Sequence, residues 1–562
     1  MRTTIDDVDR LQDTTFRQAL LDNSLQLVSA SPEDVLYTYE NTITGFAAQL
    51  TEEQARALRA QPEVLAVTHD QVYSLFTTRS SQFLGLASNA GNQRNRLFNS
   101  MPVDPQEKSQ SDGAEAESNI IIGSFDSGAW PEHPSYNDNG MAPIPAHWKG
   151  ICQEGEQWTT CNCNRKLIGA RAFYKGNELG LGKYDNISKW ADEYRSARDA
   201  DSHGTHTSTI AAGSEVANAS LFGLGLGTAR GVAKDARLAI YKVCWNNGGC
   251  SGADTLAAID QAIADGVNVV SFSIGISYDP DASPLELVDS LFIATFKAMK
   301  KGIFVSAAAG NDGPGLSTVT NVAPWVLTVA ASTLDRDFAA HITLGNGRNY
   351  TGVSFYTNDS VSNKTMLYDG GDLPLIHANL AGKDGKLGPS NCTPDNLDPE
   401  KIIGKVVVCE YAFRPPPDDF LMASGARGMI LVNKKLGGES LRGSLYDLPV
   451  VHLGFKDGLE VAKYAKESNA TVVFDFEGTR FGIPAPQMAE FSSRGPNVLV
   501  PELLKPDITG PGVDILAGWP RKSPTALQAD SRKVFFNIDS GTSMSCPQLS
   551  GVAAFMMARR PG

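Results

Sequence analysis

From residue 119 onward, short runs of apolar and β-branched residues follow one another along the chain, each ending in glycine or a small polar residue. Between these runs, apolar residues recur at the three- and four-residue spacing of helices. Short buried strands that alternate with helices are typical of a parallel α/β sheet, which binds its ligands at the carboxyl ends of the strands. The predicted strands lie within 119–128, 236–243, 266–275, 302–310 and 323–332, and the predicted helices within 253–266 and 285–302.

A smaller unit precedes this pattern. Residues 35–50 are rich in apolar and aromatic positions broken by a polar turn, which predicts strand, turn and strand. Thr51 is expected to cap the following helix, because Gln54 stands three positions on, as in a capping box. Residues 63–76 predict further strand, and the polar stretch 88–118 is typical of a linker.

The alternation of strands and helices is interrupted between residues 335 and 485. This stretch has strand-like runs of its own, such as GKVVVCEY, and one helical pattern in VVHLGFKDGLEVAKYAKES. We therefore predict an inserted, mostly β domain, after which the first pattern resumes at 489–496.

Composition limits the classes of function. The chain of 562 residues has 49 Lys and Arg against 63 Asp and Glu, so its net charge is −14. Nucleic acids and anionic lipids attract clustered basic residues, and this charge argues against both as partners. No apolar run approaches the about 18 residues of a membrane span, and no signal peptide is visible. The length suits roughly three to four domains of a soluble, acidic protein.

The eight cysteines do not identify the compartment by themselves. They are too sparse for a disulfide scaffold, and Cys161 with Cys163 lacks the second ligand pair of a zinc site, so disulfides are the favoured use of some of them. Seven N-x-S/T sequons favour secretion. The cysteines are Cys152, Cys161, Cys163, Cys244, Cys250, Cys392, Cys409 and Cys546, and the sequons begin at Asn186, Asn218, Asn349, Asn358, Asn363, Asn391 and Asn469.

Two motifs carry titratable residues at predicted element ends. Asp126 ends a predicted buried strand just before Gly128, a position that also suits a turn. His203 opens a helix of small residues and must lie close to other backbone, because Gly204 follows it. His206 stands three positions further on, which raises the alternative of a metal site, but the metalloprotease pattern H-E-x-x-H is not present.

A third motif is the run S-G-T-S-M-S-C-P at 540–547. Ser543 is expected near the start of the following helix, where free backbone N–H groups point outward, and helix capping is its alternative role. Nucleophilic acyl transfer needs a hydroxyl, a base, a carboxylate that orients the base, and donors for the oxyanion. Asn311, just beyond the predicted strand 302–310, is placed to offer a side-chain amide to such an oxyanion.

The order Asp126, His203, Ser543 along the chain is that of subtilisin, and it differs from the order in chymotrypsin and in α/β hydrolases. The segments IIGSFDSGAWPEHPSY, DSHGTHTSTIAAG, SAAAGNDGP and SGTSMSCP together resemble a plant-type subtilisin-like serine protease, over about residues 35–562. The resemblance implies that these three residues form the catalytic triad and that Asn311 is the oxyanion donor. It also implies a specificity pocket flanked by Ser271, Phe272, Ser273, Ile274 and Gly275 and by Ala307, Ala308, Ala309 and Gly310.

The same resemblance predicts how the chain is divided. Residues 30–76 would be an inhibitory propeptide, 77–118 the mature N-terminal segment and linker, 119–334 and 486–562 the two parts of the catalytic domain, and 335–485 a protease-associated domain. Maturation would cut between Phe76 and Thr77, although the family usually has His in place of Phe76. The implied partners are protein or peptide substrates and the chain's own propeptide, with no cofactor or metal, in an extracellular or vacuolar compartment.

Two departures from the family pattern bear on function. Gln548 stands where the family usually has His, which predicts altered helix packing and intact chemistry. The chain ends at Gly562, where family members continue, so we expect a partial gene product with impaired activity. The first predicted function is a serine endopeptidase made as a zymogen, and the alternative is a catalytically impaired decoy or protein-binding module. No carboxylate cluster resembles a calcium loop.

Overall fold

The computed structural model describes residues 31, 35–39, 45–48, 50–61, 64, 83–84, 110–181, 193–245, 249–275, 290–361, 367–383, 389–411, 419–522 and 532–559. The chain divides into two compact units, Met1–Ser74 and Leu75–Gly562, and each is treated by itself. The expected cleavage site at Phe76 and Thr77 and most of the predicted strand 63–76 lie outside the described residues.

The first unit contains the two predicted strands and the helix that follows them. Strands β1 (Val35–Tyr39) and β2 (Gly45–Ala48) pair antiparallel, and helix α2 spans Glu52–Arg59. The predicted capping box is confirmed, because the Thr51 hydroxyl accepts from the Gln54 N–H at 3.3 Å and the Gln54 side chain accepts from the Thr51 N–H at 2.9 Å.

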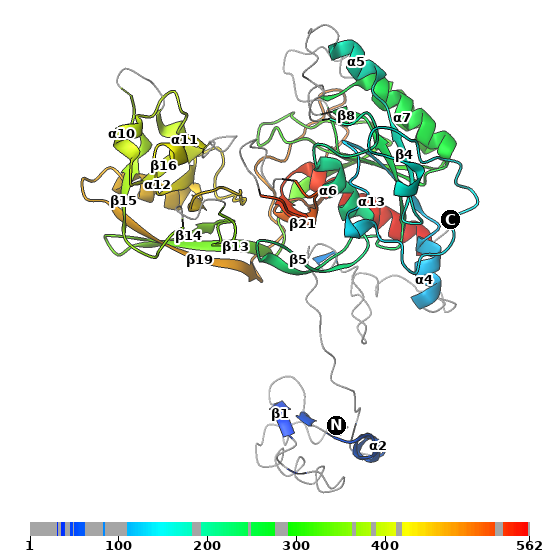
Figure 1. Cartoon of the computed structure of the whole chain (residues 1–562), viewed down its shortest axis with the longest axis horizontal. Helices are drawn as coiled ribbons and strands as arrows, with labels where there is room; N and C mark the ends of the chain where they lie inside the picture. The colour runs from blue at the N-terminus through cyan, green and yellow to red at the C-terminus, as the bar shows by residue number, and fades with distance from the viewer. Residues whose placement is uncertain are drawn as a thin grey trace. The chain divides into compact units, whose positions relative to one another are not determined.

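The second unit is built on a seven-stranded parallel sheet with the order β20-β12-β11-β10-β3-β7-β4 (Figure 1). Strand β3 lies between β10 and β7 and is buried along its whole length, as its run of apolar residues predicts. The five predicted strands and the α/β class are confirmed. The strands are β3 (Ile121–Asp126), β4 (Leu167–Ala172), β7 (Arg237–Lys242), β10 (Val269–Phe272), β11 (Phe304–Ala308), β12 (Leu327–Ser332) and β20 (Ile508–Pro511).

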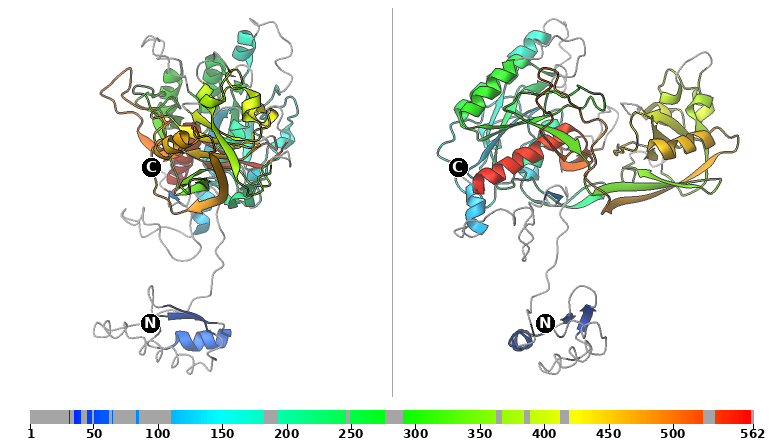
Figure 2. Two further views of the ribbon diagram at one scale, coloured as in Figure 1. Left: turned by 90° about the vertical axis from the view of Figure 1, so that its left-hand side faces the viewer. Right: turned by 180° about the vertical axis from the view of Figure 1, so that it is seen from behind.

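Helices cover both faces of this sheet, as the two turned views in Figure 2 show. Alternate residues of β3 point to opposite faces, so Ile122 packs with the small residues of α6 (His203–Ala212) and α13 (Thr542–Arg559), whereas Ile121 packs with α7 and α9. Helix α7 (Gly252–Asp265) matches the predicted helix, and α9 (Ser290–Lys300) matches the described part of the other one. A short helix, α5 (Lys175–Leu181), follows β4.

The insert contains a closed barrel with the order β13-β14-β18-β17-β16-β15-β19, visible beside the sheet in Figure 1. Its strands run from residue 336 to residue 481, inside the predicted range 335–485, and helix α12 (Phe455–Tyr464) packs on a separate apolar core. The strands are β13 (Arg336–Leu344), β14 (Asn349–Val353), β15 (Leu373–His377), β16 (Val406–Tyr411), β17 (Gly428–Asn433), β18 (Val450–Leu453) and β19 (Thr471–Phe481). The short helices α10 (Pro399–Ile402) and α11 (Asp419–Ala423) complete it.

Two hairpins join the barrel to the part of the unit that holds the parallel sheet, through one apolar cluster. They are β5 (Val216–Leu221) with β6 (Leu224–Ala229), and β21 (Ile515–Gly518) with β22 (Phe536–Asp539). Phe338 of β13 lies in this cluster with residues of both hairpins, and its ring meets Phe355 edge-on at 5.1 Å. The insert is therefore packed against the part that holds the parallel sheet, as well as connected to it by the chain.

Helix α4 (Gln110–Glu117) lies in the range predicted as a linker, and the polar composition did not predict it. Its last residue explains the difference, because Glu117 is 4% exposed and accepts from the Asp235 N–H at 3.1 Å. Arg559 at the end of α13 lies 3.6 Å from the same carboxylate. Tertiary contacts at Glu117 thus fix a segment whose local sequence is typical of a linker.

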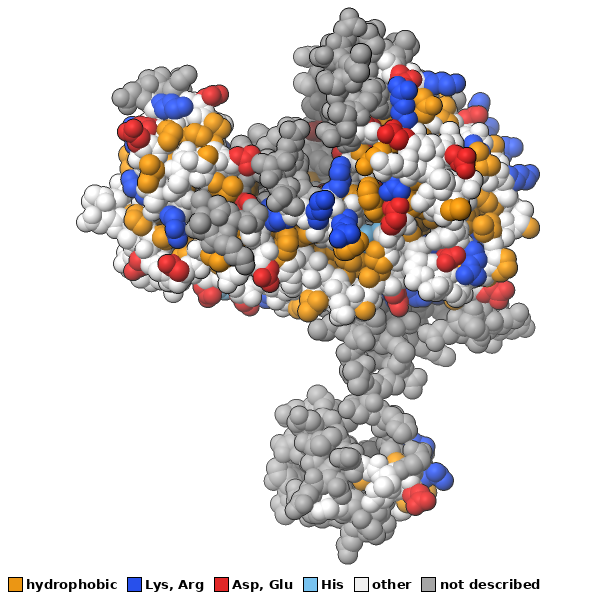
Figure 3. Space-filling model, in the orientation of Figure 1, with side chains coloured by type: hydrophobic (Ala, Val, Ile, Leu, Met, Phe, Trp, Pro, Cys, Tyr) orange, Lys and Arg blue, Asp and Glu red, His pale blue; other side chains and the backbone are white. Residues whose placement is uncertain are grey.

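On the side shown in Figure 3, Lys and Arg side chains lie among Asp and Glu side chains. None of the helices in the described ranges is long and apolar enough to cross a membrane. Within the same ranges, no three His, Cys, Asp or Glu residues come together as a metal site would require.

Candidate active site

Asp126 occupies the carboxyl end of β3, at the edge of the sheet where parallel strands bind ligands. The residue is 2% exposed, and its carboxylate is fully engaged. Oδ1 accepts from His203 Nδ1 at 2.7 Å and from the Ser127 N–H at 2.8 Å, and Oδ2 accepts from the Thr207 hydroxyl at 2.9 Å. Asp126 therefore orients the imidazole, and the simple turn role considered from the sequence does not account for these contacts.

His203 opens helix α6, as predicted, and its side chain remains 30% exposed. Burial lowers the pKa of His203, but the Asp126 carboxylate outweighs this effect through its charge and its hydrogen bond, and the pKa rises to about 9. Asp201 and Asp539 add to the rise. With Nδ1 bonded to Asp126, the second ring nitrogen, Nε2, is left to exchange a proton with a substrate or a nucleophile.

A buried carboxylate that the sequence did not single out holds the loop before α6. Asp199 is fully buried and accepts from the Ser127 hydroxyl at 2.9 Å, from the Ser202 N–H at 2.9 Å and from the Thr205 N–H at 2.8 Å. The Ser127 hydroxyl in turn accepts from the Gly204 N–H at 2.8 Å. Asp199 thus ties the end of β3 to the start of α6 and fixes the distance between Asp126 and His203.

The close backbone approach predicted at Gly204 is present. A Cβ on Gly204 would lie 2.3 Å from the Gly128 carbonyl oxygen, and Gly128 itself has a φ of +116°. Replacing Gly204 with alanine is expected to destabilise the folded protein by about 1–3 kcal/mol through overpacking. The measurement is the urea midpoint, with Gly252→Ala on α7 as the control, because a Cβ there meets nothing within 4 Å. Equal midpoints for the two variants would contradict the prediction.

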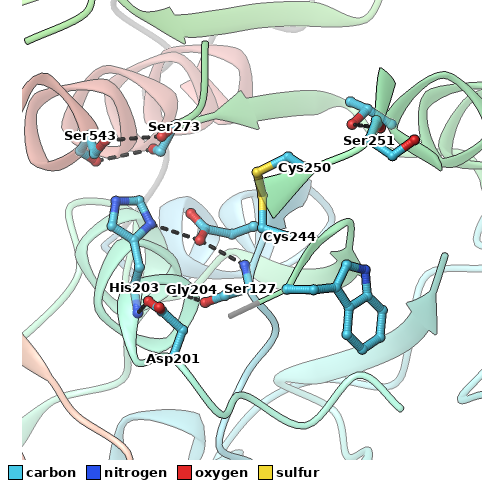
Figure 4. The surroundings of a disulfide bond; sticks show 12 residues. Ser127, Asp201, His203, Gly204, Cys244, Cys250, Ser251, Ser273 and Ser543 are labelled. Carbon is cyan, nitrogen blue, oxygen red and sulfur yellow. Dashed lines mark hydrogen bonds and ion pairs between the residues drawn. A yellow bond between two sulfur atoms is a disulfide. The ribbon is translucent and has the colours of Figure 1, made fainter. Parts of the chain in front are cut away.

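Ser543 lies in the first turn of α13 and is half-buried. Its hydroxyl donates to the carbonyl of Ser273 at 2.9 Å, and the Ser273 hydroxyl donates back to the Ser543 carbonyl at 3.1 Å. Figure 4 shows this pair at the helix end that the imidazole of His203 faces. The hydroxyl therefore ties α13 to the end of β10, and it must exchange Ser273 for His203 before it can lose its proton to that ring.

Asn311 follows β11 and lies beside the same helix end. Its Oδ1 accepts from the Thr542 N–H at 2.9 Å and from the Thr542 hydroxyl at 3.0 Å, which fixes the orientation of the amide. A Cβ placed on Gly541 would lie 3.6 Å from both Asn311 Nδ2 and the Ser543 backbone nitrogen. The Asn311 amide nitrogen and the Ser543 backbone nitrogen therefore lie close together beside Gly541.

The two segments predicted to flank a specificity pocket end at the carboxyl edge of the sheet, next to Ser543. Most of their side chains are buried, and only Ile274, Gly275 and Gly310 are partly or fully exposed. Asn321, which the sequence analysis missed, joins the segments, because its Nδ2 donates to the carbonyls of Ile274 at 2.9 Å and Ala308 at 2.8 Å. The buried residues are Ser271, Phe272, Ser273, Ala307, Ala308 and Ala309.

His206 does not join His203 in a metal site. It is fully buried, and its Nε2 faces the carbonyls of Ile515 at 3.1 Å and Asn537 at 3.2 Å. Burial lowers the pKa of His206. Gln548 is also fully buried within α13, away from the three proposed reacting groups, and neither its Nε2 nor its Oε1 has a hydrogen-bond partner.

A disulfide lies beside the candidate site (Figure 4). Cys244 and Cys250 join the two strands of a short hairpin, β8 (Cys244–Trp245) and β9 (Gly249–Cys250). The hairpin begins next to Asp126, because the Val243 N–H donates to the Asp126 carbonyl at 2.9 Å. The other two disulfides join Cys152 to Cys163 and Cys392 to Cys409, a pairing that the sequence left open. Cys161 and Cys546 are free thiols.

Comparison with protein families places this geometry in a known class. The model of the subtilase family, Peptidase_S8, matches residues 117–562, and the model of peptidase inhibitor I9 matches residues 3–76. The chain therefore belongs to the subtilase family of serine proteases, with an I9-type inhibitor segment ahead of its catalytic part.

Curated plant proteins agree with this assignment. The chain is similar to three subtilisin-like proteases of Arabidopsis thaliana: SBT1.7 (46% identical over 96% of this chain), SBT1.3 (44% over 94%) and SBT1.5 (43% over 96%). It spans 67%, 64% and 67% of their respective lengths, about two thirds of each relative.

Proposed function

We propose that the chain hydrolyses peptide bonds of protein substrates through an acyl-enzyme, with Asp126, His203 and Ser543 as the catalytic triad. The observation that carries the proposal is the 2.7 Å hydrogen bond between Asp126 and His203, on an imidazole that faces the helix end with Ser543. Membership in the subtilase family supports the same three roles.

In the proposed reaction, His203 Nε2 takes the proton of the Ser543 hydroxyl as this oxygen attacks the substrate carbonyl. The resulting imidazolium then donates the proton to the leaving amine, and water repeats the sequence to release the acyl group. Asp126 holds the Nδ1 proton in place and stabilises the positive ring, in accord with the raised pKa of His203. The Ser543 hydroxyl leaves the Ser273 carbonyl when it turns to His203.

Asn311 and the Ser543 N–H would bind the oxyanion of the tetrahedral intermediate. Both donors flank one point beside Gly541, and the bonds from Thr542 to Asn311 Oδ1 keep Nδ2 turned toward it. Such donors act mainly on charge that develops in the transition state.

Replacing Asn311 with aspartate is expected to lower kcat roughly 10²–10³-fold with little change in KM, the scale known for this donor in subtilisin. Aspartate keeps the Oδ1 that Thr542 contacts and removes the Nδ2 donor. Steady-state kinetics of Asn311→Asp and Asn311→Ala test the point. If only the alanine variant lost activity, Asn311 would act by holding Thr542 and not as an oxyanion donor.

The proposal extends to maturation and to the insert. Residues 30–76 would inhibit the enzyme until the bond between Phe76 and Thr77 is cut, and the I9 match supports the inhibitory part. The barrel at 336–481 would be a protease-associated domain. Partial exposure of Ile274, Gly275 and Gly310 supports a specificity pocket bounded by the segments 271–275 and 307–310.

We also propose that the chain is a secreted glycoprotein of the extracellular space or the vacuole. The five sequon asparagines that lie in described residues are all exposed, and three disulfides are typical of oxidising compartments. The exposed asparagines are Asn218, Asn349, Asn358, Asn391 and Asn469.

A fluorophosphonate probe tests the proposed function directly, because it labels a serine hydroxyl only when a neighbouring base activates it. Folded protein should be labelled at Ser543, and phenylmethylsulfonyl fluoride should block the label. The alternative function, a non-catalytic decoy or binding module, predicts no labelling of folded protein. That alternative is not favoured, because the contacts between Asp126 and His203 are intact and the matched relatives are proteases.

A further inference from the structure

A loop of the insert contacts the catalytic part at two segments, one of which is bonded to the turn that leads into Ser543. This docking loop, residues 438–443, lies between β17 and β18. Asn433 at the end of β17 donates to two of its carbonyls at 3.0 and 2.7 Å. His452 of β18 lies 2.7 Å from Asn433 Oδ1 and 3.1 Å from the Arg442 carbonyl. The barrel strands therefore fix the shape of the docking loop from the insert side.

On the catalytic side, the docking loop meets a buried carboxylate. The Gly443 N–H donates to Asp514 Oδ1 at 3.0 Å, and Asp514 is 4% exposed. The same Oδ1 accepts from the Ser540 hydroxyl at 3.1 Å, and the Asp514 N–H donates to that hydroxyl at 2.8 Å. One carboxylate thus joins the insert to the turn that leads into Ser543.

The burial of the Asp514 side chain makes these contacts important, because its oxygens have no water to replace lost donors. Burial raises the pKa of Asp514 to about 6, while the bonds from Gly443 and Ser540 and the charges of Arg336 and Arg442 lower it. A buried carboxylate that loses its hydrogen-bond donors is costly, so Asp514 follows the docking loop if the loop shifts. Asp514 also has a φ of +54°, which is uncommon for a residue other than glycine.

The segment that contains Asp514 packs directly beneath the turn of residues 540–543. The Gly541 N–H donates to the Gly512 carbonyl at 2.8 Å. A Cβ on Gly512 would lie 2.7 Å from the Gly541 carbonyl and 2.1 Å from the Ser545 hydroxyl. The backbones therefore touch, and a displacement of residues 512–514 moves the Ser543 N–H.

The docking loop has a second contact, and this one leads to Asn311. The Ser440 hydroxyl donates to Glu490 at 2.7 Å, at the start of the segment 490–493. Ser493 in that segment donates its N–H to the Gly310 carbonyl at 3.0 Å, and its hydroxyl accepts from the Asp312 N–H at 3.0 Å. The docking loop thus contacts both segments that support the proposed oxyanion donors.

We propose that the docking loop positions the oxyanion donors and that Asp514 is the positioning residue through which the insert acts on the turn before Ser543. The inference rests on the proposed function. It adds that the insert influences the rate of the chemical step. Because the oxyanion donors act in the transition state, loosening this contact lowers kcat more than it raises KM.

The test compares Asp514→Ala with Asp514→Asn in the full chain. Alanine removes the acceptor for Gly443 and Ser540, and kcat on fluorescently labelled casein should fall about 10–100-fold, the cost of misplacing catalytic groups by about 1 Å. Asparagine keeps an oxygen in the Oδ1 position and should retain activity within a few-fold. Hydrogen exchange of residues 540–545 should accelerate in the alanine variant and stay near wild type in the asparagine variant.

A milder pair of variants covers the case in which Asp514→Ala does not fold. Ser440→Ala removes both hydrogen bonds between this hydroxyl and Glu490, one donated to the carboxylate at 2.7 Å and one accepted from the Glu490 N–H at 3.3 Å, and should lower kcat several-fold at unchanged KM. Thr479→Val is the matched control, because Thr479 accepts from the Gly225 N–H at 2.9 Å, another contact between insert and catalytic part, away from Ser543. Ser440→Ala must therefore differ from Thr479→Val in kcat, even if both lower the melting temperature equally.

The outcomes separate the two proposals. Wild-type kcat and wild-type hydrogen exchange at 540–545 in folded Asp514→Ala or Ser440→Ala would overturn the positioning role. An equal loss of kcat in Thr479→Val would also overturn it, since the effect would then follow general stability. If hydrogen exchange responds as expected but wild-type protein takes no fluorophosphonate label, the docking loop holds the turn and the proposed enzymatic function fails.

Discussion

Replacing Ser543 with alanine is expected to lower kcat about 10⁶-fold, the scale known for loss of the nucleophile in subtilisin. The loss follows from removing the only atom that forms the acyl bond in the proposed mechanism, while the hydrogen bond to Ser273 that also disappears is one of many that hold α13. Casein hydrolysis and fluorophosphonate labelling measure the effect. The melting temperature should stay within a few degrees of wild type.

Ser118→Ala is the matched control for this variant. Ser118 is 5% exposed and lies just before the opposite end of β3, so its removal tests the cost of losing a buried hydroxyl far from Asp126. The same pair reports on maturation, because the Ser543→Ala chain should keep residues 1–76 attached and the Ser118→Ala chain should not. Residual casein hydrolysis at the wild-type rate in Ser543→Ala would rule out Ser543 as the nucleophile.

Replacing Asp126 with asparagine is expected to lower kcat/KM about 10⁴-fold. It should also move the acid limb of the profile of kcat/KM against pH to lower pH. His203 must be neutral to act as the base, and the Asp126 charge holds its pKa at about 9, above the usual 6.5. Without that charge the pKa of His203 falls, because burial, which lowers it, is no longer outweighed to the same extent. The wild-type rate therefore rises with pH through about 9, and the variant's much lower rate levels off at lower pH.

The same shift has a consequence for stability, which provides an independent measurement. A raised pKa stabilises the folded state below pH 6.5, where His203 is charged in both states, and this contribution is lost as pH rises through about 9. Asp126→Asn should remove this loss of stability between pH 6.5 and about 9. Asp337→Asn is the control: Asp337 lies on the insert and pairs with Arg480 at 2.6 Å, so its replacement should leave the pH-dependent loss unchanged. An unchanged acid limb in Asp126→Asn would show that Asp126 does not set the charge of His203.

The sequence alone predicted the sheet, and it singled out the candidate site residues, because both depend on local patterns. A buried parallel strand such as β3 is a continuous apolar run, and the ends of such strands share one edge, so Asp126 could be placed next to other strand-end residues. His203 and Ser543 stand in short motifs of small residues that only close backbone packing explains. The structure then supplied the contact between Asp126 and His203.

The residues that the sequence did not single out act through contacts between distant segments. Asp199 binds Ser127 across 72 positions, and Asp514 binds Gly443 across 71, so neither leaves a periodic signal nearby. Helix α4 was missed for the same reason, because the burial of Glu117 depends on Arg559 and Asp235. The bond from Ser543 to Ser273 depends on a side-chain rotamer, which no sequence pattern specifies.

The position of the barrel within the chain also has a consequence for the order of folding. It separates β12 from β20, so the edge of the parallel sheet and the helix with Ser543 are synthesised after the whole insert. Contacts between such distant segments form late, since the loop between their ends must close first. During translation, Asp126 and His203 can thus assemble on a nascent chain that still lacks the proposed nucleophile, and the Ser543 hydroxyl joins them only when helix α13 docks.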